Sequence, residues 1–141
     1  MSNDADILYP SIVMAMMTLL LLLALGARRF IAVRRRAVNL RYYRTYDDGG
    51  GEPPALRRHS RHVQNHFEVP PLFHLAVWGT YAAGDVTAAT IGAAWFFVAT
   101  RVVHAAIHLG PNNVSQRFFV FGLGVLAVLY LWLQLLLSLL A

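Results

Sequence analysis

The fold is decided by residues 61–73, RHVQNHFEVPPLF, where a polar, basic stretch runs into an apolar one. If this stretch is helical, Arg61, Asn65 and Glu68 follow one another at intervals of four and three residues. At 100° per residue their side chains stay within about 60° of one another, so one helix face carries a cation, an amide and a carboxylate. The two prolines that follow cannot donate hydrogen bonds one turn back, so we expect the helix to bend beside Glu68.

A second apolar segment, residues 86–109, repeats this pattern. Arg101, His104 and His108 lie three and four residues apart, so they share one face of a helix. An ionisable residue inside a membrane span costs roughly 2.5–3.5 kcal/mol near the centre of the bilayer, so it usually marks a site or a charge pair. We therefore expect the two polar faces to lie together, with Arg101 paired to Glu68.

The composition indicates an integral membrane protein. The chain has 141 residues, of which 57% are hydrophobic and only 13% are charged. Its apolar residues gather in segments of about the 20 residues that a hydrocarbon core of about 30 Å requires. These segments are residues 7–26, 67–83, 86–109 and 118–140. They predict a single all-α domain, a four-helix membrane bundle with membrane lipids as neighbours and no nucleic acid as a partner.

The distribution of charge predicts the topology. Ten of the 12 arginines lie within residues 28–61, between the first two segments, whereas the N-terminal flank carries Asp4 and Asp6. Positively charged flanks stay on the cytoplasmic side, so we expect residues 44–57 to form a cytoplasmic loop and both chain ends to be external. The loop contains glycines and prolines that interrupt a helix, and we expect it to be mobile and open to proteases at residues 49–51. The membrane is then a bacterial inner membrane or, in a eukaryote, the endoplasmic reticulum.

The chain contains no cysteine, which excludes disulfides, thiolate metal sites, iron–sulfur clusters and a protein thiol nucleophile. Any thiol chemistry must therefore come from a bound small molecule, and no metal site is predicted. Four histidines outside the second polar face are interpreted as structural: His59, His62, His66 and His74. A haem site made by two histidines is a weaker alternative, because His104 and His108 share one helix and their best partner, His66, lies off the first polar face.

Two spaced motifs resemble those of a known family. The first is an arginine followed by asparagine, glutamate, proline and phenylalanine, here Arg61, Asn65, Glu68, Pro71 and Phe73. The second ends the third segment and continues into the fourth, with Arg101, His104, His108, Gly110 and Arg117. Together with the four-segment topology, these motifs resemble the MAPEG family, the membrane-associated proteins of eicosanoid and glutathione metabolism. The resemblance is greatest to its microsomal prostaglandin E synthase and microsomal glutathione transferase type.

This resemblance implies a homotrimer that binds glutathione near the cytoplasmic face, between neighbouring subunits. Arg117 would be the catalytic residue, Arg101 would support the site, and Arg28 at the end of the first helix would reach a glutathione carboxylate. The residues expected to form the glutathione site are Arg28, Arg61, Asn65, Glu68, Arg101, His104 and His108.

The residue types suit glutathione chemically. The two carboxylates of the tripeptide call for arginines, and its α-amino group calls for a carboxylate such as Glu68. A guanidinium at Arg117, in a poorly hydrated pocket, would favour the thiolate form of a thiol whose reference pKa is about 8.5. We therefore expect a glutathione-dependent membrane enzyme that acts on lipophilic electrophiles by conjugation, peroxide reduction or isomerisation.

Three departures from the family pattern keep a second reading open. His108 stands where tyrosine is common, Gln64 where a basic residue is common, and Phe118 where a serine sometimes occurs. A non-catalytic membrane subunit or scaffold is the alternative that these departures favour.

Overall fold

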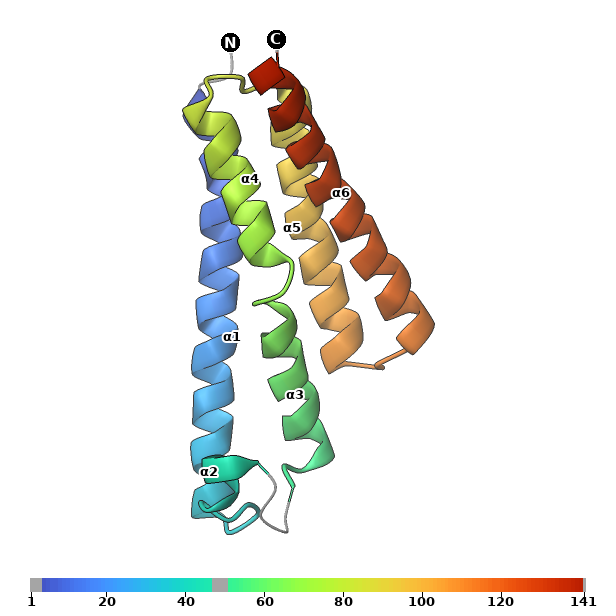
Figure 1. The fold of residues 1–141 in the computed structure, drawn as a ribbon. Coiled ribbons are helices and arrows are strands. Elements are labelled where there is room, and N and C mark those ends of the chain that lie inside the picture. Colours follow the sequence, from blue (N-terminus) through green and yellow to red (C-terminus); the bar gives the residue numbers. More distant parts are fainter. Residues whose placement is uncertain (1–3, 47–50, 141) are drawn as a thin grey trace.

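The computed structural model describes residues 4–46 and 51–140, and these residues fold almost entirely as helices. The helices are η1 (Asp4–Ile7), α1 (Leu8–Arg34), α2 (Tyr42–Thr45), α3 (Pro54–Asn65), α4 (Pro70–Ala82), α5 (Ala88–Leu109) and α6 (Val114–Leu140). Figure 1 shows α1 beside α3 and α4, which follow one another end to end, and α5 beside α6. The predicted all-α fold is confirmed. α1 begins and α6 ends at the same end of the bundle.

Three helical runs are long and apolar enough to cross a membrane. They are Asp4–Arg34 and α6, each with a mean hydropathy of 2.3, and α5, with a mean hydropathy of 1.4. The chain is therefore an integral membrane protein. The predicted segment 67–83 contains α4, which has 13 residues and reaches only about 20 Å at 1.5 Å per residue. Because a hydrocarbon core is about 30 Å thick, α4 alone is too short to cross it.

The helix is interrupted between α3 and α4. The backbone N–H groups of His66 and Phe67 donate to carbonyls three residues back, at 3.0 and 2.9 Å, so the helix tightens into turns. Pro70 and Pro71 then open α4, where the N–H groups that they lack would have no helical partner. The prediction of one bent helix that keeps Glu68 on a continuous face is therefore wrong, because Glu68 lies in the connection.

An apolar core joins α1, α4, α5 and α6. Phe73 of α4 stacks on Phe97 of α5 with ring centroids 4.3 Å apart. Both side chains are fully buried, as are those of Met14 in α1 and Leu131 in α6. This core fixes α5 and α6 relative to α4, and so fixes the helices that carry the second polar face.

The connection from α1 to α3 is held by buried contacts. Glu52 is only 3% exposed, and its carboxylate accepts hydrogen bonds from Arg29 Nε at 2.8 Å and from Ser60 Oγ at 2.6 Å. α2 begins before residue 44, and α3 begins at Pro54. The described ends of the expected loop 44–57 are therefore helical, and Glu52 between them is buried. Of the expected protease-sensitive residues, 49 and 50 lie outside the described ranges.

Candidate functional site

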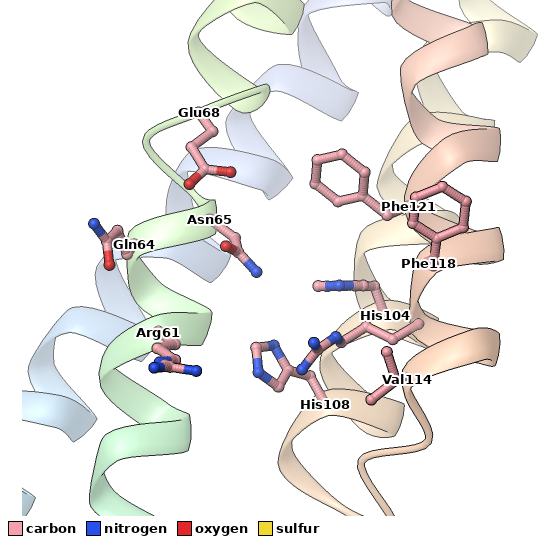
Figure 2. Close-up of a pocket in the computed structure, with 10 residues that line it drawn as sticks. Arg61, Gln64, Asn65, Glu68, His104, His108, Val114, Phe118 and Phe121 are labelled. Atoms are coloured by element: carbon pink, nitrogen blue, oxygen red, sulfur yellow. The ribbon is translucent and has the colours of Figure 1, made fainter.

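A cavity of about 440 Å³ opens between α3 on one side and α5 and α6 on the other (Figure 2). Its volume is within the range of about 300–1,000 Å³ that is usual for small-molecule sites. Six of the eight residues predicted for the site line it, and Arg28 and Arg101 do not. The lining residues are Arg61, Gln64, Asn65, Glu68, His104, His108, Val114, Arg117, Phe118 and Phe121.

One wall of the cavity is polar and comes from the end of α3 and the connection after it. Figure 2 shows Arg61 and Asn65 on α3 and Glu68 just beyond it, with the Asn65 side chain directed toward the opposite wall. The three side chains line the same cavity although the helix ends between them. The chain after Asn65 continues in hydrogen-bonded turns, and Glu68 still lines the cavity beside Arg61 and Asn65. The three side chains therefore group as predicted, although the helix is not continuous.

The opposite wall combines one cation with aromatic rings. Arg117, in the first turn of α6, donates from Nη1 to Asn112 Oδ1 at 2.9 Å, and this bond holds the guanidinium at the cavity. Asn112 adopts a left-handed conformation with φ 54°, which asparagine tolerates better than most residues. Phe118 and Phe121 continue the wall along α6. A cation and an apolar surface therefore lie beside one another.

Arg101 does not pair with Glu68, contrary to our expectation. Its side chain is 2% exposed, and Nη2 donates to the backbone carbonyl of Phe121 at 3.1 Å. The guanidinium carbon lies 5.1 Å from the ring centroid of Phe97 and 4.7 Å from that of Phe121. The only ion pair within residues 4–46 and 51–140 joins Arg29 to Glu52. Aromatic faces and a carbonyl therefore take the place of the expected carboxylate.

Gly124 makes room for this arginine on α6. A Cβ atom at Gly124 would collide with the Arg101 guanidinium and would lie 2.8 Å from Thr100 Oγ1. Thr100 donates to the carbonyl of Phe97 at 2.7 Å, so it has little freedom to move away. Arg101 therefore supports the cavity from behind, through Phe121, and does not line it.

Arg28 lies on the exposed surface of α1 and does not line the cavity. A role for Arg28 at the cavity of a neighbouring subunit stays a prediction. Its charge acts on His59 instead. Burial, together with the nearby Arg28 guanidinium, lowers the pKa of His59 below its usual value.

Sequence reasoning missed a cluster of histidines beside the cavity. His62 of α3 is fully buried, and its Nδ1 lies 3.3 Å from Nδ1 of His108. The His62 ring also stacks on that of His104, with centroids 5.6 Å apart. A signal existed, because His59, His62 and His66 repeat the spacing of three and four residues found on the third segment.

The other histidines fasten α3 and α4 to α1. His59 Nε2 lies 3.2 Å from the Leu21 carbonyl oxygen, and His66 Nδ1 lies 2.9 Å from Thr18 Oγ1. His74 Nδ1 lies 2.6 Å from Ser11 Oγ. These three contacts agree with the structural interpretation of those residues.

Comparison with known proteins covers nearly the whole chain. The sequence model of the MAPEG family matches residues 7–137, which include all six predicted residues that line the cavity. Searches of the curated proteins and of the solved structures give no match. Most MAPEG members are glutathione-dependent membrane enzymes with a four-helix fold. The chain described above therefore belongs to the MAPEG family.

Proposed function

We propose that the protein is a glutathione-dependent membrane enzyme that activates the glutathione thiol for reaction with a lipophilic substrate. The observation that carries this proposal is the convergence of Arg61, Asn65, Glu68, His104 and Arg117 on one cavity next to aromatic rings. Among MAPEG members, we expect the nearest in mechanism to be the microsomal prostaglandin E synthase and microsomal glutathione transferase type.

The lining residues provide the groups that glutathione needs. Arg61 can bind one carboxylate of the tripeptide, and Glu68 can accept hydrogen bonds from its α-ammonium group. Asn65 both donates and accepts, so it suits a peptide bond. Arg61 and Glu68 are both exposed in the single chain, so both side chains can reach a ligand.

Arg117 is the proposed activating residue. A positive charge close to a sulfur atom favours the thiolate, which is the nucleophilic form. The thiolate would attack the electrophile, and the proton that it has lost would leave through the open, polar side of the cavity. Phe118 and Phe121 provide an apolar surface for the lipophilic partner.

A homotrimer would complete the site. Arg28 lies outside the cavity of its own chain, so it could contribute a carboxylate contact only at the cavity of a neighbouring subunit. Large apolar side chains along α6, such as Phe118, Leu126 and Leu133, are exposed and available for contact with another subunit or with lipid.

The deciding experiment compares Arg117→Leu with the parent at saturating glutathione. We expect thiolate absorbance and the rate of conjugation with a model electrophile to fall together, the rate by roughly 10²–10³ as for the loss of one positioned charge. Arg41→Leu, an exposed arginine outside the cavity, is the control and should leave both unchanged.

Equal conjugation rates for Arg117→Leu and the parent would refute the role of Arg117. Binding of glutathione by the parent, without thiolate absorbance or conjugation, would instead favour the non-catalytic subunit suggested by His108, Gln64 and Phe118.

A further inference from the structure

Three buried histidines from two helices meet beside the cavity. His62 of α3 is fully buried, and His104 and His108 of α5 are each 2% exposed. One ring nitrogen from each lies within 4.8 Å of those from the other two. The Nδ1 atoms of His62 and His108 lie 3.3 Å apart. In a tetrahedral zinc site with Zn–N bonds of about 2.0–2.1 Å, neighbouring ligand nitrogens are about 3.3–3.4 Å apart. One pair already has this spacing, and the widest would need to close by at most about 1.5 Å, which side-chain rotation can supply.

The hydrogen bonding of this cluster is incomplete. Nε2 of His62 is buried and has no hydrogen-bond partner within the part of the chain that the structure describes. An unsatisfied buried polar atom costs about 1–3 kcal/mol, so such an atom in a native protein calls for a ligand or another explanation. The rings of the cluster also contact one another directly, with centroids 5.2 Å apart for His62 and His108 and 5.5 Å apart for His104 and His108. A metal ion bound at Nδ1 of His62 and His108 would replace the hydrogen bond between them, whereas one bound at Nε2 of His62 would satisfy the unpaired atom. In both cases three imidazoles with incomplete hydrogen bonding share one buried place.

We propose that His62, His104 and His108 bind a divalent transition metal ion of the Zn²⁺ class. Imidazole nitrogen suits Zn²⁺, Cu²⁺ and Ni²⁺, whereas Mg²⁺ and Ca²⁺ need oxygen donors, which three imidazoles do not supply. A tetrahedral ion held by three protein ligands keeps a fourth position open. Because His104 and His108 also line the cavity, this position faces it.

The positive charges around the histidines favour an anion as the fourth ligand of the metal ion. Arg61 and Arg117 line the same cavity, and their positive charges disfavour a dication that has only neutral ligands. An anionic fourth ligand reduces this repulsion. A bound metal ion lowers the pKa of coordinated water and thiols, so hydroxide from solvent is sufficient to supply that anion. Zn²⁺ binding can therefore be tested in the absence of glutathione, which His104 and His108 are also expected to contact.

The test uses the full-length protein in detergent, with any purification tag removed and metals stripped by a chelator. After incubation with Zn²⁺ and gel filtration, we expect one metal ion per chain. Co²⁺ should give the intense visible absorption of a four-coordinate site. His62→Gln and His104→Gln should each weaken Zn²⁺ binding by more than about 10-fold, since loss of a residue that only hydrogen-bonds to a metal ligand already costs about that much.

Two other histidines provide matched controls. His59 lies one turn before His62 on α3, and His74 lies on α4 next to Ser11. The variants His59→Gln and His74→Gln should bind Zn²⁺ as the parent does. Circular dichroism and gel filtration show whether each variant is folded. A parent that elutes without Zn²⁺, or a His62→Gln/His104→Gln double variant that retains it fully, would overturn the proposal. If both single variants unfold, the parent's Co²⁺ spectrum decides, since a weak six-coordinate spectrum would also overturn it.

Discussion

The guanidinium of Arg101 lies over the ring of Phe121, with 4.7 Å between its carbon and the ring centroid, and donates to the Phe121 carbonyl at 3.1 Å. This pair fastens α5 to α6 directly behind the cavity, which the Phe121 ring lines. A buried cation is thus stabilised by an aromatic face and a carbonyl dipole rather than by an opposite charge. The contact links a residue inside the bundle to the wall of the site.

Double-mutant cycles should distinguish the real partner of Arg101 from the expected one. For Arg101→Leu with Phe121→Leu, we expect a coupling of about 0.5–2 kcal/mol in the free energy of unfolding in detergent. For Arg101→Leu with Glu68→Leu, the losses should add to within about 0.5 kcal/mol. A coupling of about 3–5 kcal/mol with Glu68 would restore the desolvated ion pair and contradict the structure.

Gly124→Ala should destabilise the bundle by about 1–3 kcal/mol, because the new methyl group would collide with the Arg101 guanidinium. Gly122→Ala, two residues earlier on α6, is the matched control. A Cβ atom there meets nothing within 4 Å, so alanine should be neutral or stabilise the helix by up to about 1 kcal/mol. Thermal unfolding of the two variants in the same detergent gives the comparison. Similar melting temperatures for both would mean that Arg101 is packed elsewhere.

Glu68→Gln should weaken glutathione binding by roughly 10- to 150-fold, since a hydrogen bond to a charged group is worth about 1.5–3 kcal/mol. Isothermal titration calorimetry with the detergent-purified protein measures this change. Asp85→Asn, in the connection between α4 and α5 and outside the cavity, is the control and should bind as the parent does. An unchanged dissociation constant for Glu68→Gln would remove the carboxylate from the site.

Glu52→Ala should expose the connection between α2 and α3 to proteases. The substitution leaves Arg29 and Ser60 without their shared acceptor and takes away the only ion pair of the described residues. We expect limited proteolysis to become several-fold faster, with the new cleavage sites mapped by mass spectrometry to residues 44–57. Asp85→Ala provides the reference for loss of an acidic residue from another connection. Cleavage at the parent's rate would show that Glu52 does not hold the segment.

Much of the candidate site was predictable because it depends on periodicity. Arg61, Asn65, His104 and His108 recur at helical intervals in or beside apolar segments, and polar side chains in such places are driven toward one another by the cost of facing lipid. This argument requires only approximate helix positions, which is why it tolerated the break before Pro70.

Other features depended on geometry that periodicity does not contain. A buried arginine can be satisfied by carboxylates, carbonyls or rings, so the choice of Phe121 over Glu68 required the actual distance between α5 and α6. The His62 cluster required the rotation of α3 relative to α5. The burial of Glu52 required the return of the chain onto Arg29, across a stretch rich in glycine and proline.

The two walls of the cavity differ in polarity. The Arg61 wall continues into a polar helix, whereas the wall with Phe118 and Phe121 belongs to a helix with a mean hydropathy of 2.3. Phe118 is 78% exposed at the rim, so in the single chain this side of the cavity opens onto the apolar surface of α6. A water-soluble molecule would then enter the cavity along the Arg61 wall, and an apolar molecule would enter along the wall of Phe118 and Phe121. The two would come into contact only inside the cavity.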